Sequence, residues 1–294
     1  MGITETALSQ SGIRRSSRAD MVAWLRRIGG QPDEEIDLAA GALALAGLAR
    51  PGADLMRYEH HLSLLARDVA DLGARAAAGE DLNARAETLS QVIAGRYGYS
   101  GDEETYDDLE NADLMRVIDR RMGLPVALGI LFIHAGRAQG WHIEGLNFPG
   151  HFLLRLELDG ARAILDPFHG GAIRQTADLR ALLKTLAGNE AELQPEHYEP
   201  LGNRDVLLRL QNNLKLRLMR RQQPAEAVEV VETMLMFAPA HAQLWREAGL
   251  IHAHLENLRA AALALENYLE LAEAGDSRRH EAAELLSNLR KRLN

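Results

Sequence analysis

A histidine and an aspartate in the middle of the chain have the residue types and spacing of a catalytic pair. His151 begins the segment "HFLLRLEL", Asp166 ends the segment "ARAILD", and only Asp159-Gly160 separates the two segments. An aspartate that orients a histidine is the arrangement with which enzymes produce a general base or activate a nucleophile. The pair therefore raises the question of which group, if any, it would activate.

The Asp-Gly dipeptide between the segments predicts how they meet. It favours a two-residue turn between antiparallel strands, which places Leu158 opposite Ala161. Continuing that register brings His151 and Asp166 to one face as diagonal neighbours on adjacent strands, about 7 to 8 Å apart at their backbones. A three-residue loop would instead move one of the two side chains to the opposite face.

Two helices are expected before these strands, and the second is apolar on every side. In "ENADLMRVIDRRMG" we expect Asn111 to cap the N-terminus and Gly123 to be the left-handed residue at the end. Arg120 and Arg121 are expected to complement the helix C-terminus, with the alternative that one of them lines a site. Pro125 suits the first position of the next helix, and "VALGILFI" after it predicts a helix buried on all sides.

The remaining periodicity indicates an α+β fold. Apolar residues recur at spacings of three and four over residues 34–47, 58–73 and 83–95, which predicts three further packed helices. The pattern changes to strands in "WHIEGLNF", "HFLLRLEL" and "ARAILDPF".

A strand histidine backed by an aspartate, following a buried helix, resembles the core of the transglutaminase-like superfamily, which is related to the papain-like cysteine proteases. The resemblance implies a cysteine at the start of the buried helix, activated by the histidine. That position falls near Leu124, Pro125 or Val126, and none of these side chains can attack a substrate. The chain contains no cysteine at all, and no serine or threonine replaces it in the first turn.

Three longer segments narrow the resemblance. "NADLMRVIDRRMGLPVALGILF", "GLNFPGHFLLR" and "LDPFHGG" look like the bacterial SirB family, transglutaminase-like proteins with C-terminal tetratricopeptide repeats that are associated with regulation of invasion genes. The resemblance is strong over residues 106–171 and resumes near the C-terminus. It implies that His151 and Asp166 occupy residual triad positions and that the cysteine has been lost.

The C-terminal third repeats with a period of 34 residues. Aligning residues 211–240 with residues 245–274 at this offset matches three pairs of positions: Ala227 with Ala261, Leu235 with Leu269, and Lys215 with Gly249. Trp245 lies at a position typical of tetratricopeptide repeats, in which small residues let paired helices pack closely. We predict two repeats and a terminal helix from Arg278; the alternative is an ordinary helical bundle.

The composition limits the class of protein. The chain has 294 residues, of which 47% are hydrophobic and 26% charged, and its net charge is -9. Because the basic residues form no cluster, we expect no direct nucleic-acid partner. No signal peptide and no run of about 18 apolar residues is present, so we expect no membrane association and a cytoplasmic location. Residues 9–18, rich in serine and arginine, are expected to be loose.

The candidate residues also have structural interpretations. The His151 and Asp166 pair could be only a structural hydrogen bond, and His134 is expected to be a hydrogen-bonded core histidine. His142 and His169, together with the pair, could suggest a metal site. However, the histidines lack a spacing that fixes them on one helix face, and no glycine-rich phosphate loop occurs. We therefore expect no metal and no other cofactor.

The sequence as a whole predicts an N-terminal tail and first helix (1–30), an α+β transglutaminase-like domain (31–200) and tetratricopeptide-like helical repeats (201–294). The leading functional hypothesis is a non-catalytic regulatory protein that binds a protein or peptide partner. The alternative is a hydrolase or transferase in which His151, oriented by Asp166, activates water without a cysteine nucleophile.

Overall fold

A computed structural model describes residues 17–293, and these residues form two compact units. The first unit comprises residues 17–21 and 32–210, and the second comprises residues 22–31 and 211–293. Most of the segment expected to be loose, residues 9–16, lies outside the described residues.

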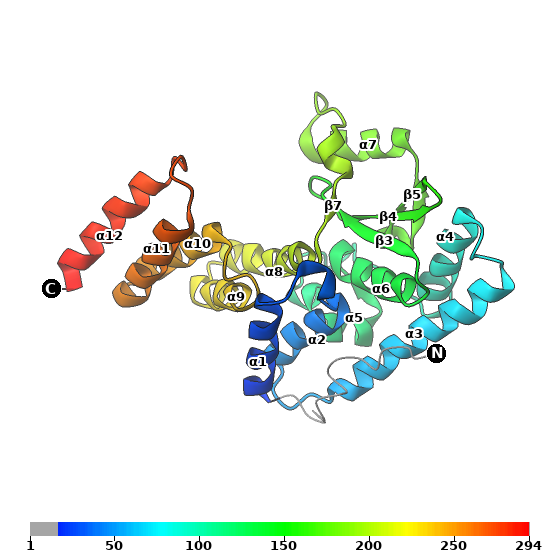
Figure 1. Cartoon of the computed structure of the whole chain (residues 1–294), viewed down its shortest axis with the longest axis horizontal. Helices are drawn as coiled ribbons and strands as arrows, with labels where there is room; N and C mark the ends of the chain where they lie inside the picture. Colours follow the sequence, from blue (N-terminus) through cyan, green and yellow to red (C-terminus); the bar gives the residue numbers. More distant parts are fainter. Residues whose placement is uncertain (1–16, 294) are drawn as a thin grey trace. The chain divides into compact units, whose positions relative to one another are not determined.

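Six α-helices of the first unit are drawn in Figure 1: α2 (Leu38–Ala49), α3 (Leu55–Arg75), α4 (Leu82–Ser90), α5 (Leu114–Arg120), α6 (Pro125–Arg137) and α7 (Thr176–Ala187). Four of them begin after an aspartate whose side chain accepts a backbone N–H of the first turn: Asp37, Asp54, Asp81 and Asp113. The helices expected from periodicity are present, although α2 begins only at Leu38 because Asp37 caps it. The helix predicted over 83–95 is α4 continued by a π-helix, Gln91–Arg96.

The N-terminus of α5 differs from the expectation. Its cap is Asp113, whose side chain accepts the backbone N–H of Arg116 at 3.0 Å. The residue expected to cap it, Asn111, is fully buried in a short 3-10 turn, Leu109–Ala112. Its amide donates to the carbonyl of Thr105 at 2.8 Å, so that side chain is committed elsewhere.

The C-terminus of α5 also differs from the expectation. The left-handed residue is Arg121, with φ 61°, and not Gly123. The N–H of Arg121 donates to the carbonyl of Val117 at 2.8 Å. Gly123 instead lies in β2 (Met122–Gly123), which pairs in parallel with β1 (Ser100–Gly101). A Cβ at position 123 would lie 2.7 Å from the Val117 side chain, so the glycine is needed for close packing rather than for its φ.

A five-stranded antiparallel sheet has the order β6-β5-β4-β3-β7, with β3 (His142–Leu146), β4 (Leu153–Leu158), β5 (Ala161–Asp166), β6 (Ala172–Arg174) and β7 (Pro200–Leu201). The predicted hairpin register is confirmed, since Leu158 pairs with Ala161. Asp159 and Gly160 have φ of 49° and 83°, as a type I′ turn requires.

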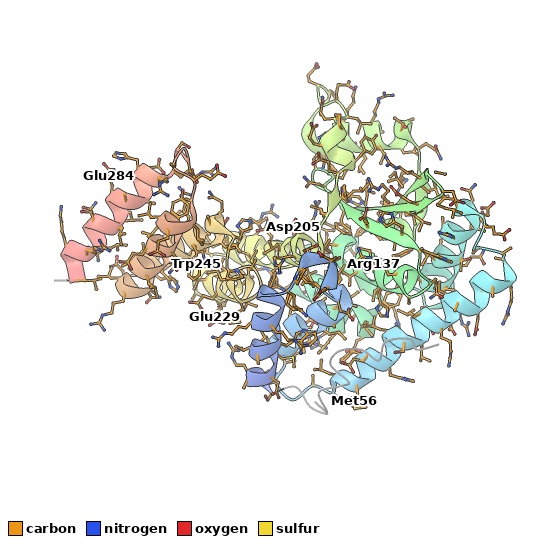
Figure 2. The ribbon with its side chains drawn as sticks, in the orientation of Figure 1. Met56, Arg137, Asp205, Glu229, Trp245 and Glu284 are labelled. Carbon is orange, nitrogen blue, oxygen red and sulfur yellow. The ribbon has the colours of Figure 1, made fainter. Side chains whose placement is uncertain are left out.

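Helix α6 is the core of the first unit, as its sequence predicts. Pro125 is at its start, and α6 contacts the sheet as well as α2, α3, α4 and α5. A Cβ at Gly129 would lie 2.4 Å from the ring of Phe152, so a glycine is needed where the helix meets the sheet. At the other end Arg137, labelled in Figure 2, donates to the carbonyl of Ile143 at 3.1 Å and to Oδ1 of Asn203 at 2.7 Å.

The second unit is helical: α1 (Arg18–Gly29), α8 (Asn203–Arg220), α9 (Pro224–Phe237), α10 (Ala242–His254), α11 (Leu258–Leu271) and α12 (Arg279–Leu293) contribute to it, with α1 and α8 shared with the first unit. The aligned pair Ala227 and Ala261 is fully buried, as the 34-residue period predicts. At Gly249 of α10 a Cβ would lie 2.7 Å from Leu265 of α11, which shows how closely these helices approach. The indole of Trp245 (Figure 2) donates to the carbonyl of Pro239 at 2.8 Å.

None of the helices described by the structure is both long and apolar enough to cross a membrane.

Candidate functional site

The structure brings His151 and Asp166 together. Nε2 of His151 lies 3.0 Å from Oδ1 of Asp166. His151 lies just before β4 and Asp166 is the last residue of β5, so the tight hairpin between these strands sets their separation. The Asp166 side chain is 1% exposed and the His151 side chain 10% exposed.

Asp166 accepts more hydrogen bonds than this pairing alone. Its Oδ1 also accepts the backbone N–H of Phe168 at 3.1 Å, and its Oδ2 accepts Nδ1 of His169 at 2.8 Å. Nε and Nη2 of Arg174 also donate to Oδ2, at 3.1 and 2.9 Å. A buried carboxylate with this many donors is fixed in orientation and satisfied in charge.

The segment after Asp166 explains how these donors arrive. Asp166 caps a short 3-10 helix, Pro167–His169, which puts Phe168 and His169 back over the carboxylate. Gly170 and Gly171 both have positive φ and reverse the chain into β6, where Arg174 lies beside β5. Sequence reasoning missed Arg174 and gave His169 no specific role, although the Asp-Pro and Gly-Gly dipeptides do indicate a cap and a turn.

The electrostatics keep Asp166 ionised. Burial alone would raise the pKa of Asp166, but hydrogen bonds and charge from His151 and His169 outweigh burial and hold that pKa well below its usual range. The aspartate therefore orients the imidazole and does not itself deliver a proton.

The other ring nitrogen of His151 is available. Among residues 17–293, Nδ1 of His151 has no hydrogen-bond partner. Because Nε2 faces a carboxylate it carries the proton in the neutral ring, which leaves Nδ1 as the acceptor. The ring of Phe168 packs edge-on against the imidazole, with centroids 6.1 Å apart. Such an imidazole can take a proton from water or from a nucleophile placed at Nδ1.

A chain of contacts links this imidazole to the start of α6. Gly123, two residues before the helix, pairs with Gly101. A Cβ on Gly101 would lie 2.5 Å from the ring of Phe168, which packs against His151. One strand pairing and two packing contacts therefore connect Gly123, just before the helix, to the imidazole.

The helix start itself carries no reactive group. Leu124 is fully buried, Val126 is 1% exposed, and Pro125 between them is buried as well. All three side chains are hydrocarbon, so they can neither attack a substrate nor hold a proton.

Arg209 of α8 fixes the loop that carries His151, and sequence reasoning did not identify it. Its Nη2 donates to the carbonyl of Phe148 at 2.9 Å and also to the carbonyl of His151. The guanidinium lies 5.6 Å from the ring centroid of Phe152. Burial lowers the pKa of Arg209. These contacts hold the backbone on both sides of the imidazole.

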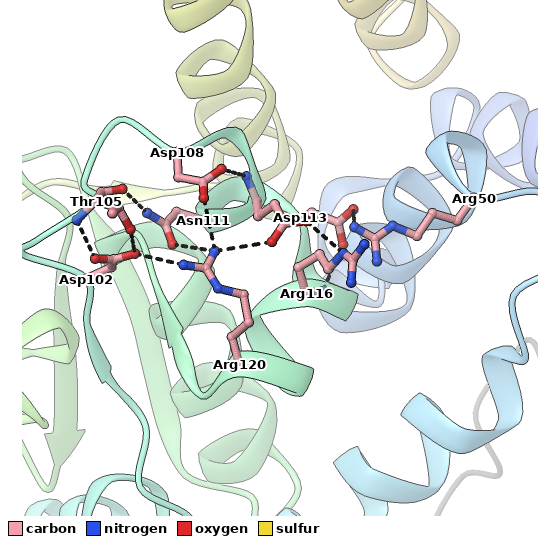
Figure 3. Close-up of polar contacts among 9 residues, drawn as sticks. Arg50, Asp102, Thr105, Asp108, Asn111, Asp113, Arg116 and Arg120 are labelled. Carbon is pink, nitrogen blue, oxygen red and sulfur yellow. Dashed lines mark hydrogen bonds and ion pairs between the residues drawn. The ribbon is translucent and has the colours of Figure 1, made fainter.

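A second polar network holds the turn that leads into α6 (Figure 3). Asp102 accepts Nη2 of Arg120 at 3.0 Å and the backbone N–H of Thr105 at 2.8 Å. Oδ1 of Asn111 accepts a hydrogen bond from Nη1 of Arg120 at 3.3 Å. The backbone carbonyl of Asn111 accepts one from the N–H of Leu124 at 3.0 Å. Burial opposes ionisation of Asp102, yet hydrogen bonds from Thr105 and Asn111 and the charge of Arg120 lower its pKa. Arg120 therefore has specific carboxylate and amide partners beyond the helix terminus.

The other histidines considered from the sequence have different partners. His142 lies beside Glu157 at 3.1 Å and Glu144 at 3.4 Å on the sheet, and not beside Asp166. His134 places Nε2 3.3 Å from the carbonyl of Leu62, as expected for a core histidine, and burial lowers its pKa.

His151, Asp166 and His169 have the residue types of a metal site. Their potential ligand atoms lie within 4.8 Å of one another, and two imidazoles with a carboxylate suit zinc or iron. However, Arg174 already donates twice to Oδ2 of Asp166. A cation at that oxygen would meet the guanidinium charge, which disfavours a metal there.

Comparison with known proteins determines the family. The model of the Transglutaminase-like superfamily matches residues 57–212, more than half of the chain. The chain belongs to the transglutaminase-like superfamily. A Tetratricopeptide repeat model matches residues 214–290 of this transglutaminase-like protein, which confirms the expected α+β domain followed by helical repeats.

The curated relatives agree with the SirB resemblance. A UPF0162 protein of Vibrio cholerae is 33% identical over 228 residues, covering 76% of this chain and 83% of the relative. A UPF0162 protein of Xylella fastidiosa is 28% identical over 246 residues, covering 81% and 85%. Protein SirB1 of Salmonella typhimurium is 30% identical over 188 residues, covering 63% and 68%. A solved structure of menin is similar with a TM-score of 0.40 at 10% identity, covering 94% and 77%, which is too weak to establish a shared fold.

Proposed function

We propose that this transglutaminase-like protein is a non-catalytic, cytoplasmic regulator that binds a protein or peptide partner. In this proposal a transglutaminase-like domain over residues 31–200 keeps the frame of a catalytic site, and the repeats over residues 201–294 supply the binding surface. His151 and Asp166 are the residual triad positions.

The observation that carries the proposal is the inert start of α6. The oriented imidazole of His151 is present, but Leu124, Pro125 and Val126 are buried hydrocarbon side chains. The sequence contains no cysteine that could replace them. Since a triad acts through its nucleophile, an intact pair beside an inert helix start supports a scaffold more than a thiol enzyme.

The repeats support the binding half of the proposal. Leu216 and Met219 on α8 and Leu250 on α10 are 46%, 43% and 39% exposed. Leu216 and Leu250 are 34 residues apart and occupy equivalent positions of successive repeats. Stacked repeats place equivalent positions side by side, so these side chains form an apolar surface of the kind that recognises peptides.

The test is capture of a partner by the full-length protein and by two matched variants. We expect Leu250→Asp to abolish capture of a specific protein, because a charge replaces an apolar contact. Leu263→Asp is the control, since Leu263 is 59% exposed but lies on α11. Equal capture by both variants would contradict binding through the equivalent positions of α8 and α10.

The alternative is a hydrolase or transferase without a cysteine. It is favoured by Nδ1 of His151, which has no hydrogen-bond partner in the part of the chain that the structure describes. In that reaction His151 would take a proton from water, and the ionised Asp166 would stabilise the resulting imidazolium. The test is release of ammonia from glutamine-containing peptides and incorporation of a labelled amine. Activity that His151→Gln abolishes would establish the enzyme, whereas the non-catalytic proposal expects none above background.

A further inference from the structure

A second cluster of ionisable side chains in the first unit takes no part in the site around His151. His61 on α3 places Nε2 2.8 Å from the hydroxyl of Tyr99. Nη1 of Arg121 lies 2.7 Å from the same Nε2 and also donates to the hydroxyl of Tyr99. The guanidinium carbon of Arg121 is 4.8 Å from the ring centroid of Tyr99 and 5.7 Å from that of Tyr97. Two rings and an imidazole therefore fix the plane of one guanidinium.

The guanidinium of Arg121 is the unusual member of this cluster. Among residues 17–293 it forms no ion pair with a carboxylate, and its Nη1 donates only to neutral groups. Within that range, Nε and Nη2 of Arg121 have no hydrogen-bond partner. Neither atom is fully buried. This leaves open to solvent the Nε and Nη2 edge, with which arginine holds an oxyanion through two parallel hydrogen bonds.

The charges around Arg121 are unbalanced. Arg57 pairs with Asp119, while Arg67 and Arg96 share Asp68 at 3.7 and 3.2 Å. With Arg121 the group contains four arginines and two aspartates, an excess of two positive charges. The chain as a whole has a net charge of -9, so this excess is local.

The backbone conformation of Arg121 is also uncommon for a residue with a long side chain. Its φ of 61° is a left-handed conformation that glycine adopts at lower cost. The chain nevertheless has a long charged side chain here, and that side chain donates to residues 60 and 22 positions away in the sequence. An arginine here thus has a backbone cost that a glycine would not have.

We propose that Arg121, His61, Tyr97 and Tyr99 form a binding site for the phosphate group of a phosphate monoester. Arg121 takes two phosphate oxygens through Nε and Nη2. A phosphate monoester is a dianion near neutral pH, so it neutralises the two excess positive charges, which a monocarboxylate would not. This site goes beyond the proposed function and uses none of its residues.

His61 suits this site as a neutral donor. Burial, with the charge of Arg121 and of the neighbouring His60, lowers the pKa of His61 to about 4, although Asp119 opposes the shift. Since its Nε2 accepts from Arg121, the proton lies on Nδ1, which can donate a further hydrogen bond to the ligand.

The experiment is calorimetric titration of the full-length protein with inorganic phosphate, phenyl phosphate and acetate at constant ionic strength. We expect saturable phosphate binding that Arg121→Gly weakens by at least about tenfold. Because glycine relieves the left-handed residue, the variant should keep or exceed the wild-type Tm. Gln222→Gly is the matched control: Gln222 has φ 58° in the second unit, so its Tm should rise without a change in phosphate binding.

Two further measurements locate the bound anion. Arg121→Lys keeps the charge but loses the planar fork, so it should also bind phosphate more weakly than wild type while remaining folded. The imidazole NMR signals of His61, assigned with His61→Gln, should shift on phosphate addition. Tighter binding of phenyl phosphate than of phosphate would assign an aryl ester as ligand, and equal affinity would assign the phosphate group alone.

Three results would overturn the proposal: no saturable binding of either phosphate compound, undiminished binding by folded Arg121→Gly, or acetate bound as tightly as phosphate.

Discussion

The two units of this protein solve the problem of close packing in opposite ways. In the first unit the centre of the site is a buried charge, since Asp166 is fully buried and accepts donors from four other residues. In the second unit the helices pack through small apolar residues instead, since Ala227 of α9 and Ala261 of α11 are each fully buried. A buried carboxylate needs every donor in place, whereas small apolar residues need only the right volume.

The contrast continues within the repeats. Gly249 permits close approach to Leu265, but the equivalent position one repeat earlier is Lys215. Lys215 is 7% exposed and its ammonium pairs with Glu247 of α10. At this position, where the first repeat has a lysine and the second a glycine, the second unit also contains a partly buried ion pair. The difference between the units therefore lies in which interaction sets the spacing, and substitutions can measure it.

The largest effect is expected from Asp166→Asn. The amide cannot balance the positive charge of Arg174 or accept every donor, so the free energy of unfolding should fall by about 3 to 5 kcal/mol. Chemical denaturation measures the change. Asp71→Asn, at an exposed position on α3, is the control and should stay within about 0.5 kcal/mol of wild type.

Acid should reduce the difference between Asp166→Asn and wild type. The pKa of Asp166 in the folded protein lies below its unfolded value of about 3.9. Its stabilisation is therefore complete above that pH and is lost as pH falls through the folded pKa. A difference that is constant from pH 7 to pH 3 would show that the carboxylate charge does not hold the hairpin.

The helix packing around Ala261 should respond to a change in side-chain volume and not to a change in charge. Ala261→Phe overpacks a fully buried position and should cost about 1 to 3 kcal/mol with little dependence on pH. Leu263→Phe adds volume to the exposed side of the same helix and should stay within about 0.5 kcal/mol of wild type. Equal effects of the two variants would mean that the helices are not tightly packed around Ala261.

His61 should make the stability of the first unit depend on pH in the mildly acidic range. Its folded pKa of about 4 lies below the unfolded value of about 6.5, so unfolded chains bind a proton that folded chains do not. Stability is then complete above pH 6.5 and falls by about 1 to 2 kcal/mol towards pH 4, since partial exposure screens the charge. His61→Gln should flatten this part of the stability curve; parallel curves for both proteins would contradict the assignment.

The smallest effect is expected at the hairpin turn. Asp159 has φ 49°, so Asp159→Asn should leave stability within about 0.5 kcal/mol. Asp159→Ala should cost about 1 kcal/mol, because alanine tolerates the left-handed region less well. Thermal unfolding distinguishes the two, and a larger loss in the asparagine variant would mean that the turn is held by the aspartate charge.

Much of the site could be predicted because local turn chemistry fixed it. Asp159-Gly160 determined the register that puts His151 next to Asp166, and Pro125 marked the start of α6. The prediction of the two ends of α5 was wrong, and this too has a physical reason. Asn111 and Gly123 have the right residue types for helix ends, but burial assigns the first to Thr105 and close packing assigns the second to β2.

The sequence by itself determined the features that act over a few residues or repeat at a fixed interval. These are the hairpin, the apolar helix, the absence of a cysteine nucleophile and the 34-residue period. The tertiary structure alone decided the long-range partners. Arg209 donates a hydrogen bond to the carbonyl of His151, and Arg121 donates one to His61, 60 residues away in the sequence. The physical reason is that turn and helix preferences depend on neighbouring residues, whereas a side chain gains a distant partner only after the core has packed around both.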